Sequence, residues 1–325
     1  MKELGYVTGM AGKWHLGYRP ELAPLKRGFD EFFGFPGGAH SYIDARADKA
    51  NPILRGTEPV EEKEYLTDAF TREAVSFIDR HSREPFFLYL TYNAVHTPMH
   101  ASEVRLAQFK HIADDRRRAF ATMLTAMDDG VGKVLAKLRD KKIEDDTLVV
   151  FISDNGGPTQ ANTSSNLPLR GFKGQVYDGG IRVPFLAQWK STLPKGKVYE
   201  EPVIALDLLP TAVAAAGGKA PANLDGVDLT PYVTGKRKGA PHSSLYWRFG
   251  PQHAIRQGDW KMLQAPGGGP ELYNLRADIG ESKNMAASEP ERLAAMETAY
   301  DDWNKQLAEP KWNTRRQRPQ RRRRK

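Results

Sequence analysis

Short polar segments of this sequence carry side chains suited to chemistry on an anion. Gly12-Lys13-Trp14-His15 places a lysine two residues before a histidine, just after the strand-like residues 5–10. If the extended conformation continues, both side chains point the same way, and a fixed cation stands beside a titratable imidazole. That pair suits an anionic substrate that needs proton transfer. His96-Thr97-Pro98 supplies a second imidazole. Taken singly, each of these residues is more often a surface or core group.

Two further segments offer oxygen ligands and basic groups. Asp154-Asn155-Gly156-Gly157 provides a carboxylate and an amide oxygen, which are hard donors suited to Ca²⁺ or Mg²⁺. Taken alone, those four residues are more often a simple turn. The glycine-rich, basic run 169–184 includes Lys173, and glycines beside basic residues can cradle an anion. We expect Asp178 and Arg182 in this run to tie it to the sheet.

The elements that must position these segments alternate between strands and helices. The apolar runs 86–90, 147–152 and 183–189 are typical of strands, and we expect the first to be buried on both faces. Apolar residues at spacings of three and four predict helices over 66–78, 120–138 and 206–216. This alternation predicts a parallel sheet with helices on its faces. Ligands bind beyond the carboxyl ends of such strands, where His96 and Asp154 stand.

The character of the chain changes after about Gly235. Short strand-like pieces predict a small antiparallel sheet, and apolar residues at helical spacing from 293 to 307 predict a helix beside it. We expect the aromatic residues Trp247 and Trp260 to lie in the core of this part. The predicted domains are an α/β domain over 1–235, a small antiparallel sheet plus helix over 236–312, and a basic tail over 313–325.

Composition and charge exclude several classes. The 325 residues include no cysteine, so the chain as given has no disulfide, thiolate metal site or cysteine nucleophile. No apolar run approaches the roughly 20 residues of a membrane span, and residues 1–6 lack the apolar stretch of a signal peptide. The net charge of +8 is concentrated in the tail, because the remaining 40 basic residues equal the 40 acidic ones. We expect a disordered, solvated tail, with anion or nucleic-acid binding as the alternative.

Together the four segments resemble type I sulfatases in their order and spacing. These are Gly12-Lys13-x-His15, His96-x-Pro98, Asp154-Asn155-Gly156 and the run 169–184. Gly28-Phe29-Asp30, Tyr65-Leu66-Thr67-Asp68, Ala126-Met127-Asp128-Asp129 and Leu272-Tyr273-Asn274-Leu275 add to the resemblance, which extends to about Leu307. It implies an α/β fold, an alkaline-phosphatase-like sandwich with a mostly parallel central sheet, and hydrolysis of sulfate monoesters.

The resemblance also implies residue roles. In that family a hydrated formylglycine attacks sulfur, and one Ca²⁺ ion holds this nucleophile and the sulfate oxygens. Asp154 and Asn155 would be two of its ligands. Lys13 would hold the formylglycine hydroxyl and the sulfate, and Lys173 would bind sulfate and neutralise charge on the bridging oxygen. His96 would protonate the leaving alcohol. His15 would deprotonate the second hydroxyl and so regenerate the aldehyde.

One part of the family pattern is not found in this chain. Family members carry two metal-binding aspartates and a Cys/Ser-x-Pro/Ala-x-Arg sequence upstream of the Gly-Lys-x-His motif, which here begins at residue 12. None of the serines from Ser41 to Ser191 has that context. We therefore expect half the metal ligands and the covalent catalyst to be absent, as in a fragment or a chain with a misplaced start codon. We expect no sulfate ester hydrolysis and poor stability, because a missing central strand leaves edges unpaired and apolar faces open.

Other possibilities remain open at this stage. The substrate would be a sulfated small molecule or glycan, with carbohydrate sulfates favoured over aryl sulfates, and neither a membrane nor nucleic acid is expected as a partner. A phosphoryl or phosphonate hydrolase of the same superfamily and a non-catalytic anion- or glycan-binding remnant are the alternatives. Relatives are usually periplasmic or secreted, but this sequence assigns no location. His40 is expected in a surface loop or lining the substrate pocket, and His100 is a second candidate for a substrate contact.

Overall fold

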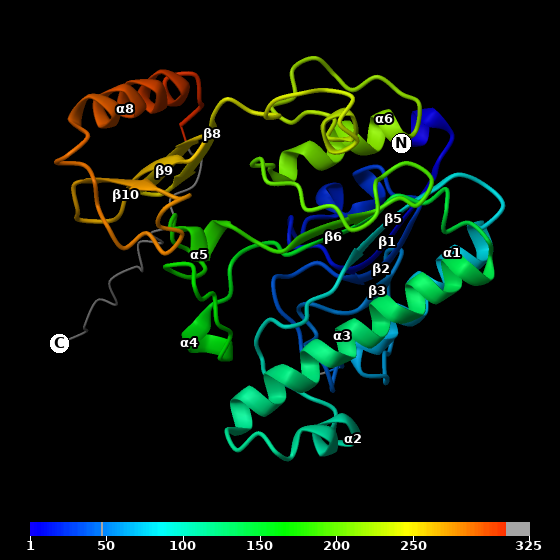
Figure 1. Ribbon diagram of the computed structural model, residues 1–325. Coiled ribbons are helices and arrows are strands. Elements are labelled where there is room, and N and C mark those ends of the chain that lie inside the picture. Colours follow the sequence, from blue (N-terminus) through cyan, green and yellow to red (C-terminus); the bar gives the residue numbers. More distant parts are fainter. Residues whose placement is uncertain (47, 310–325) are drawn as a thin grey trace, which may run out of the picture. The chain divides into compact units, whose positions relative to one another are not determined.

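The computed structural model describes residues 1–46 and 48–309 (Figure 1). The predicted tail 313–325 lies outside the described residues. By contact, the chain separates into two compact units. Among the described residues, the larger unit contains 1–152, 158–165 and 185–239, and the smaller unit contains 153–157, 166–184 and 240–309. Two segments of the predicted α/β domain, 153–157 and 166–184, therefore pack with the C-terminal part, a grouping that a boundary near residue 235 does not anticipate.

The larger unit is built on a five-stranded sheet of order β4-β3-β2-β1-β5. Strand β1 (Val7–Lys13) lies between β2 (Glu31–Phe35) and β5 (Phe86–Thr91) and pairs in parallel with both. The short strands β3 (Leu54–Arg55) and β4 (Glu58–Pro59) extend the other side in antiparallel pairing. The prediction of parallel strands is confirmed for β1, β2 and β5, although β2 itself was not anticipated.

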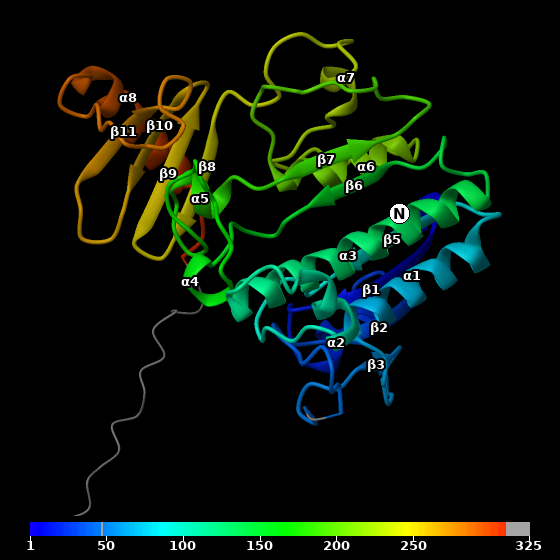
Figure 2. The ribbon, with the colours of Figure 1, turned by 60° about the horizontal axis from the view of Figure 1, so that its bottom comes forward.

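Helices α1 (Leu66–His81) and α3 (Asp115–Asp140) run side by side on one face of this sheet (Figure 2). Both predictions of a helix are confirmed, with the apolar stripe of α1 fully buried at Leu66, Ala69 and Phe70. These side chains join Phe33, Phe35 and Ile53 of the sheet side in one core cluster. Asp114 caps the start of α3 by accepting a hydrogen bond from Arg117 N at 2.6 Å.

Strand β5 is not buried as its composition predicts. We expected the run 86–90 to be covered on both faces, yet none of its residues is buried and Tyr89 is 48% exposed. The reason is its position: β5 pairs with β1 on one edge, and no other described strand pairs with its second edge. Full burial of a strand requires elements packed on both faces as well as neighbours on both edges.

Strands β6 (Val149–Ile152) and β7 (Phe185–Gln188) form a separate two-stranded antiparallel sheet in the larger unit. Both strands were predicted, but their expected place in the parallel sheet is wrong within the described residues, because β6 pairs only with β7. Helix α6 (Leu208–Ala215) follows and confirms the prediction over 206–216. The remaining short elements of this unit are α2 (Glu103–Leu106), α4 (Thr159–Asn162), α7 (Thr230–Val233) and the 3₁₀ helices Lys2–Leu4, Pro20–Leu22, Pro24–Lys26, Ala107–Phe109 and Ala205–Asp207.

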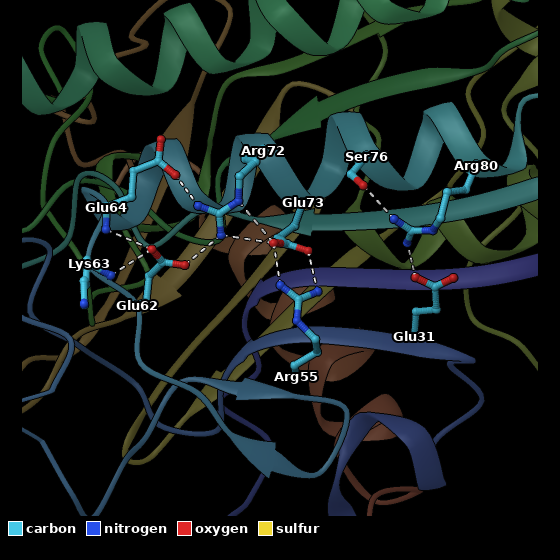
Figure 3. Close-up of polar contacts among 9 residues, drawn as sticks. All are labelled: Glu31, Arg55, Glu62, Lys63, Glu64, Arg72, Glu73, Ser76 and Arg80. Carbon is cyan, nitrogen blue, oxygen red and sulfur yellow. Dashed lines mark hydrogen bonds and ion pairs between the residues drawn. The ribbon is translucent and has the colours of Figure 1, made fainter.

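An ion-pair network joins α1 to the edge of the five-stranded sheet (Figure 3). Both guanidinium nitrogens of Arg55 on β3 donate to Glu73 on α1, each at 2.7 Å. Arg72 bridges Glu73 to Glu62, with Nη2 3.0 and 2.7 Å from the two carboxylates. Hydrogen bonds to these carboxylates raise the pKa of Arg55 and of Arg72, and they outweigh burial, which acts to lower both values. A bidentate, networked pair of this kind stabilises more than an isolated surface ion pair.

The smaller unit is built on a four-stranded antiparallel sheet of order β11-β10-β9-β8. Its strands are β8 (Leu245–Phe249), β9 (Gln252–Gln257), β10 (Trp260–Gln264) and β11 (Pro270–Asn274), and α8 (Pro290–Asn304) packs on it. Both the sheet and the helix confirm the sequence prediction. Trp260 packs with the cluster under α8, and Trp247 packs with a second cluster that includes Tyr177 and Tyr273.

Within residues 1–46 and 48–309, no helix is both long and apolar enough to span a membrane.

Candidate functional site

Lys13 and His15 stand where strand β1 ends. Lys13 is the last residue of β1, and the chain then stays beside β2 through Trp14 N to Phe35 O at 3.0 Å and His15 N to Pro36 O at 3.1 Å. The extended conformation does not continue to His15, whose φ of 58° lies in the left-handed region. The alternation expected to aim both side chains the same way is therefore wrong, because the backbone turns between them.

The imidazole of His15 lies against the backbone of Gly38. A Cβ atom placed on Gly38 would lie 2.4 Å from His15 Nε2, closer than any side chain could approach. Gly38 belongs to the loop after β2, which therefore forms one wall beside the ring. A glycine is required where a side chain approaches the backbone this closely.

His96 lies beyond the end of the neighbouring strand β5. The parallel register pairs Gly12 of β1 with Thr91 of β5, and Thr91 Oγ1 donates to Lys13 O at 2.8 Å. The segments after the two strands therefore leave the sheet at the same end, beyond the carboxyl ends of the strands. Ligands of α/β folds bind in this position. His96 is half-buried, and its Nδ1–H donates to Thr97 O at 2.8 Å. The larger unit thus brings the predicted residues Lys13, His15 and His96 to one edge of its sheet.

Asp154 and Asn155 follow β6 and belong to the smaller unit. The Ser153 hydroxyl donates to Asn155 O at 2.9 Å, and Asn155 Nδ2 donates to Gly156 O at 3.1 Å. These bonds use the amide nitrogen of Asn155 and not its Oδ1, which is the atom that a cation would take. Asp154 is exposed.

Lys173 lies beside this turn in the same unit. Lys173 N donates to Gly157 O at 3.4 Å, and Gly156 N donates to Gly180 O at 3.0 Å, so the turn and the run 169–184 are joined at two points. A Cβ atom on Gly156 would lie 1.8 Å from Gly179 O, which only glycine permits. The smaller unit therefore brings together the predicted ion ligands and the predicted sulfate-binding lysine.

Buried charges hold the run 169–184 to the antiparallel sheet. Lys261 Nζ on β10 lies 2.6 Å from Asp178 Oδ1 and 2.7 Å from Glu281 Oε1, and all three side chains are at most 4% exposed. Asp178 N also donates to Glu281 Oε2 at 2.7 Å at the start of α5 (Asp178–Ile181). Burial raises the pKa of Glu281, while Lys261 acts in the opposite direction. Asp178 does tie the run to the sheet, as predicted, and Arg182 contributes a longer contact of 3.6 Å to its carboxylate.

Sequence reasoning missed several residues of these surroundings. A lysine in a short strand predicts a solvated side chain, so Lys261 was not singled out. His40, expected in a surface loop or lining a pocket, is 3% exposed and lies with its Nδ1 2.9 Å from Ser41 O and its Nε2 3.0 Å from Asn51 O. Asn93, three residues before His96, is also buried, and neither polar atom of its amide has a hydrogen-bond partner among the described residues.

The fit of a metal ion can be tested on the donors present. Asp154 and Asn155 offer hard oxygen donors that suit Ca²⁺, but an all-protein Ca²⁺ site needs about six to eight oxygens. Within residues 1–46 and 48–309, no three His, Cys, Asp or Glu side chains gather closely enough to hold an ion. The chemistry of the pair fits Ca²⁺, and its number of ligands falls short of a complete site.

Comparison with known families decides what kind of protein carries this arrangement. The family model for sulfatases matches residues 1–218, and the model for the C-terminal part of N-sulphoglucosamine sulphohydrolase matches residues 172–306. The chain belongs to the sulfatase family. The resemblance to type I sulfatases noted from four motifs is thereby confirmed, and the family's members are sulfuric ester hydrolases.

Individual relatives of this sulfatase-family chain agree. N-acetylgalactosamine-6-sulfatase of Canis lupus familiaris is 34% identical over 282 residues, which cover 80% of this chain and 52% of the relative. Arylsulfatase A of Homo sapiens is 30% identical over an alignment covering 90% of this chain and 68% of the relative. The chain thus spans about half the length of the N-acetylgalactosamine-6-sulfatases that it matches.

Solved structures confirm the predicted alkaline-phosphatase-like fold. Ps i-CgsB in complex with k-i-k-neocarrahexaose superposes with a TM-score of 0.90 and 37% identity, covering 96% of this chain and 74% of that chain. The PsFucS1 sulfatase from Pseudoalteromonas sp. superposes with a TM-score of 0.76 at 21% identity, which shows the fold alone.

Proposed function

We propose that this sulfatase-family chain binds the sulfate group of a sulfated carbohydrate and supplies the cationic and proton-transferring residues for hydrolysis of that ester. One observation carries the proposal: Lys13 and His96 follow neighbouring parallel strands and leave the sheet at one edge. A cation and an imidazole placed in this way suit an anion whose leaving group needs a proton.

The two lysines would bind the sulfate. Lys13 ends a central strand and is half-buried, so its ammonium group is held by a rigid element and partly screened from water. Lys173 belongs to a run that is hydrogen-bonded to the Asp154 turn and anchored by buried ion pairs. Preorganised cations stabilise charge that develops on the bridging oxygen in the transition state, because they need not reorganise.

The two histidines would move protons. The bond from His96 Nδ1–H to Thr97 O leaves Nε2 as the nitrogen that exchanges a proton with the leaving alcohol. His15, held against Gly38 in a left-handed conformation, would take the proton from the second hydroxyl of the nucleophile. Both roles require an imidazole that can take up and release a proton.

Asp154 and Asn155 would hold a Ca²⁺ ion through carboxylate and amide oxygens. When bound, such an ion withdraws charge from sulfate oxygens and orients the nucleophile. The 325 residues contain no cysteine, and their one Ser-x-Pro-x-Arg sequence, Ser288 to Arg292, leads into α8 and does not precede the Gly-Lys-x-His motif, so we assign no formylglycine precursor within them. We therefore expect this chain, studied by itself, to bind sulfate esters without hydrolysing them.

The substrate class rests on the relatives. One is named for N-acetylgalactosamine 6-sulfate, and one solved structure holds a carrageenan oligosaccharide. These names support a sulfated glycan as the substrate of this protein, with the particular sugar and linkage left to experiment because specificity lies in loops that differ among members of a fold.

Calorimetric titration of the full chain with a 6-O-sulfated hexose tests the proposal. Lys13→Met and Lys173→Met are each expected to weaken binding about 10-fold or more, since each removes a charged hydrogen bond to the anion. Lys195→Met, an exposed lysine beyond β7, is the matched control and should leave the affinity unchanged.

The same titration separates the alternatives. Tighter binding of the 6-O-phosphorylated sugar would favour a phosphoryl hydrolase. Binding that disappears on deletion of residues 313–325 would transfer the anion site to the tail. Full affinity in both Lys13→Met and Lys173→Met would overturn the proposal. Release of sulfate from the ester by the purified chain would contradict the expected lack of turnover.

A further inference from the structure

One buried hydroxyl fixes the backbone that carries His96. Tyr42 is 1% exposed, and its hydroxyl lies 2.5 Å from Asn93 O and 2.9 Å from His96 O. Both acceptors are backbone carbonyls, so the hydroxyl is shared between them as the only possible donor. His96 N donates to Asn93 O at 2.8 Å and closes the same turn. Tyr42 therefore contacts both ends of the turn from Asn93 to His96.

The turn determines where the imidazole lies. The ring of His96 bonds through Nδ1 to Thr97 O, a carbonyl of the adjacent residue, so its orientation depends on the local backbone rather than on a distant side chain. Movement of the Asn93–His96 turn would change that Nδ1 bond and with it the nitrogen that carries the proton in the neutral ring. The hydroxyl of Tyr42 opposes this movement.

The loop that bears Tyr42 is itself held by hydrogen bonds to Asn51, in the segment between β2 and β3. His40 is buried between Ser41 O and Asn51 O, and Gly37 N donates to Asn51 Oδ1 at 2.8 Å. A buried loop with satisfied polar groups is rigid, because each lost hydrogen bond would leave an unpaired buried group. Tyr42 is therefore held on a firm support and not on a mobile surface loop.

The same loop also contacts the other histidines of this edge. Gly38 lies against the ring of His15, and Ser41 Oγ lies 3.2 Å from His100 Nδ1. Residues 37–42, which we name the histidine-support loop, thus contact the segments that carry His15, His96 and His100. These histidines are far apart in the sequence. Their common contact with one loop couples their positions.

We infer that Tyr42 is a positioning residue for His96, and that the histidine-support loop sets the geometry of the proton-transferring edge. The inference rests on the proposed function for the role of His96, although the contacts do not depend on it. Tyr42 cannot act on substrate directly, because its hydroxyl is buried and engaged with two carbonyls. Burial also raises the pKa of Tyr42, so the phenol stays protonated and remains a donor.

The test measures the ring of His96 by NMR in the ¹⁵N-histidine-labelled full chain, with His96→Gln used for assignment. In the wild type, the neutral ring is expected to carry its proton mainly on Nδ1. In Tyr42→Phe, the ratio of Nδ1–H to Nε2–H tautomers should fall about 3-fold or more, because the hydrogen bonds that hold the turn are lost.

Tyr65→Phe is the matched control. Tyr65 stacks on Tyr42 with ring centroids 5.8 Å apart, and its hydroxyl donates to His100 O at 2.9 Å. Its loss removes a comparable hydrogen bond from the same neighbourhood but not from the Asn93–His96 turn. Both variants should lower the melting temperature, while only Tyr42→Phe should change the tautomer ratio of His96. A general loss of stability would change the tautomer ratio of His96 in both variants or in neither.

Two results would overturn the inference: an unchanged tautomer ratio in folded Tyr42→Phe, or a wild-type ring protonated mainly on Nε2. If Tyr42→Phe does not fold, the NMR signal of the Tyr42 hydroxyl proton in the wild type tests the contact instead. A hydroxyl proton bonded as described exchanges slowly and shows NOEs to the Asn93–His96 turn, and its absence from the spectrum would contradict the contact. These readouts need no turnover and no bound sulfate, so failure of the proposed function would leave them unchanged.

Discussion

Lys261 and Glu281 form an ion pair in which neither side chain is exposed to solvent, with Nζ 2.7 Å from Oε1. Asp178 completes the group at 2.6 Å from the same ammonium. Two carboxylates thus depend on one buried cation, and the run that contains Lys173 depends on one of those carboxylates for its attachment to the sheet.

Lys261→Met is therefore expected to destabilise the smaller unit by about 3–5 kcal/mol, because it leaves Glu281 buried without this counterion and Asp178 with only the 3.6 Å contact to Arg182. Urea unfolding followed by the fluorescence of Trp247 and Trp260 measures the change. Arg276→Met is the control: its partner Asp259 lies 2.7 Å away, but the arginine side chain is 80% exposed. An exposed pair should contribute at most about 1 kcal/mol. Equal losses in the two variants would show that burial of the Lys261 pair does not matter.

Gly156→Ala is expected to separate the Asp154 turn from the run 169–184. The added Cβ would meet Gly179 O at 1.8 Å, and because the obstacle is backbone the loop must move as a whole. We expect a loss of about 1–3 kcal/mol or more, together with faster amide hydrogen exchange over residues 170–180. Gly269→Ala in the hairpin between β10 and β11 meets nothing within 4 Å and should leave both measurements unchanged. Wild-type exchange in Gly156→Ala would refute the close approach.

Two glycines of α3 should respond in opposite directions to alanine. Gly132 faces open space, so Gly132→Ala should raise stability by about 0.5–1 kcal/mol through the lower entropy of the unfolded chain. Gly130 lies under the Thr71–Tyr92 hydroxyl pair, and its Cβ would meet those oxygens at 2.4 and 2.5 Å. Gly130→Ala should therefore destabilise. Thermal melts of the two variants test the packing of α1 on α3, and a shift of the same sign in both would contradict it.

The contribution of His81 to stability should depend on pH. Burial acts to lower its pKa, but the contacts with Glu84 at 2.6 Å and Glu31 at 2.8 Å outweigh this and raise it above 6.5. A raised pKa means that the folded chain binds the proton more tightly than the unfolded chain. The stabilisation is therefore complete below about pH 6.5 and is lost as the pH rises through the folded value.

Melting temperatures of the wild type and His81→Gln at several pH values test this sign. The wild type should exceed the variant most below pH 6.5, and the difference should shrink as the medium becomes alkaline. A difference that grows with rising pH would mean that the carboxylates do not favour the protonated imidazole.

The sequence predicts best the elements that are encoded by residues close together in the chain. The stripe of α3 appears in the sequence because apolar residues recur at the helical period, and β8 to β11 appear as short strand-like pieces separated by Gly, Pro and Asp. The positions of Lys13 and His96 at the carboxyl ends of strands were also predictable, because Lys13 ends β1, His96 follows β5, and each belongs to a short motif. Burial was less predictable: β5 has the composition of a central strand, but its exposure depends on which strand lies beside it.

Long-range partners explain the other differences. Lys261 is buried because Asp178 and Glu281, which are 83 and 20 residues away in sequence, meet it in the fold. His40 is buried because Asn51 and Ser41 supply carbonyls to both ring nitrogens, which no local polarity pattern indicates. The turn at His15 was missed for a related reason, since its contact is with Gly38 of another loop. Sequence reasoning finds the residues that follow strands but not those that support them from elsewhere.

The half-exposed apolar strand β5 also has a practical consequence for handling the protein. A strand whose outer edge has no hydrogen-bonding neighbour among the described residues, and whose side chains are apolar, is a template onto which further chains can add. When produced by itself, the protein should accumulate in insoluble particles to an extent that rises steeply with expression level and concentration. Lysine in place of Tyr89, the most exposed residue of that strand, should improve the soluble yield.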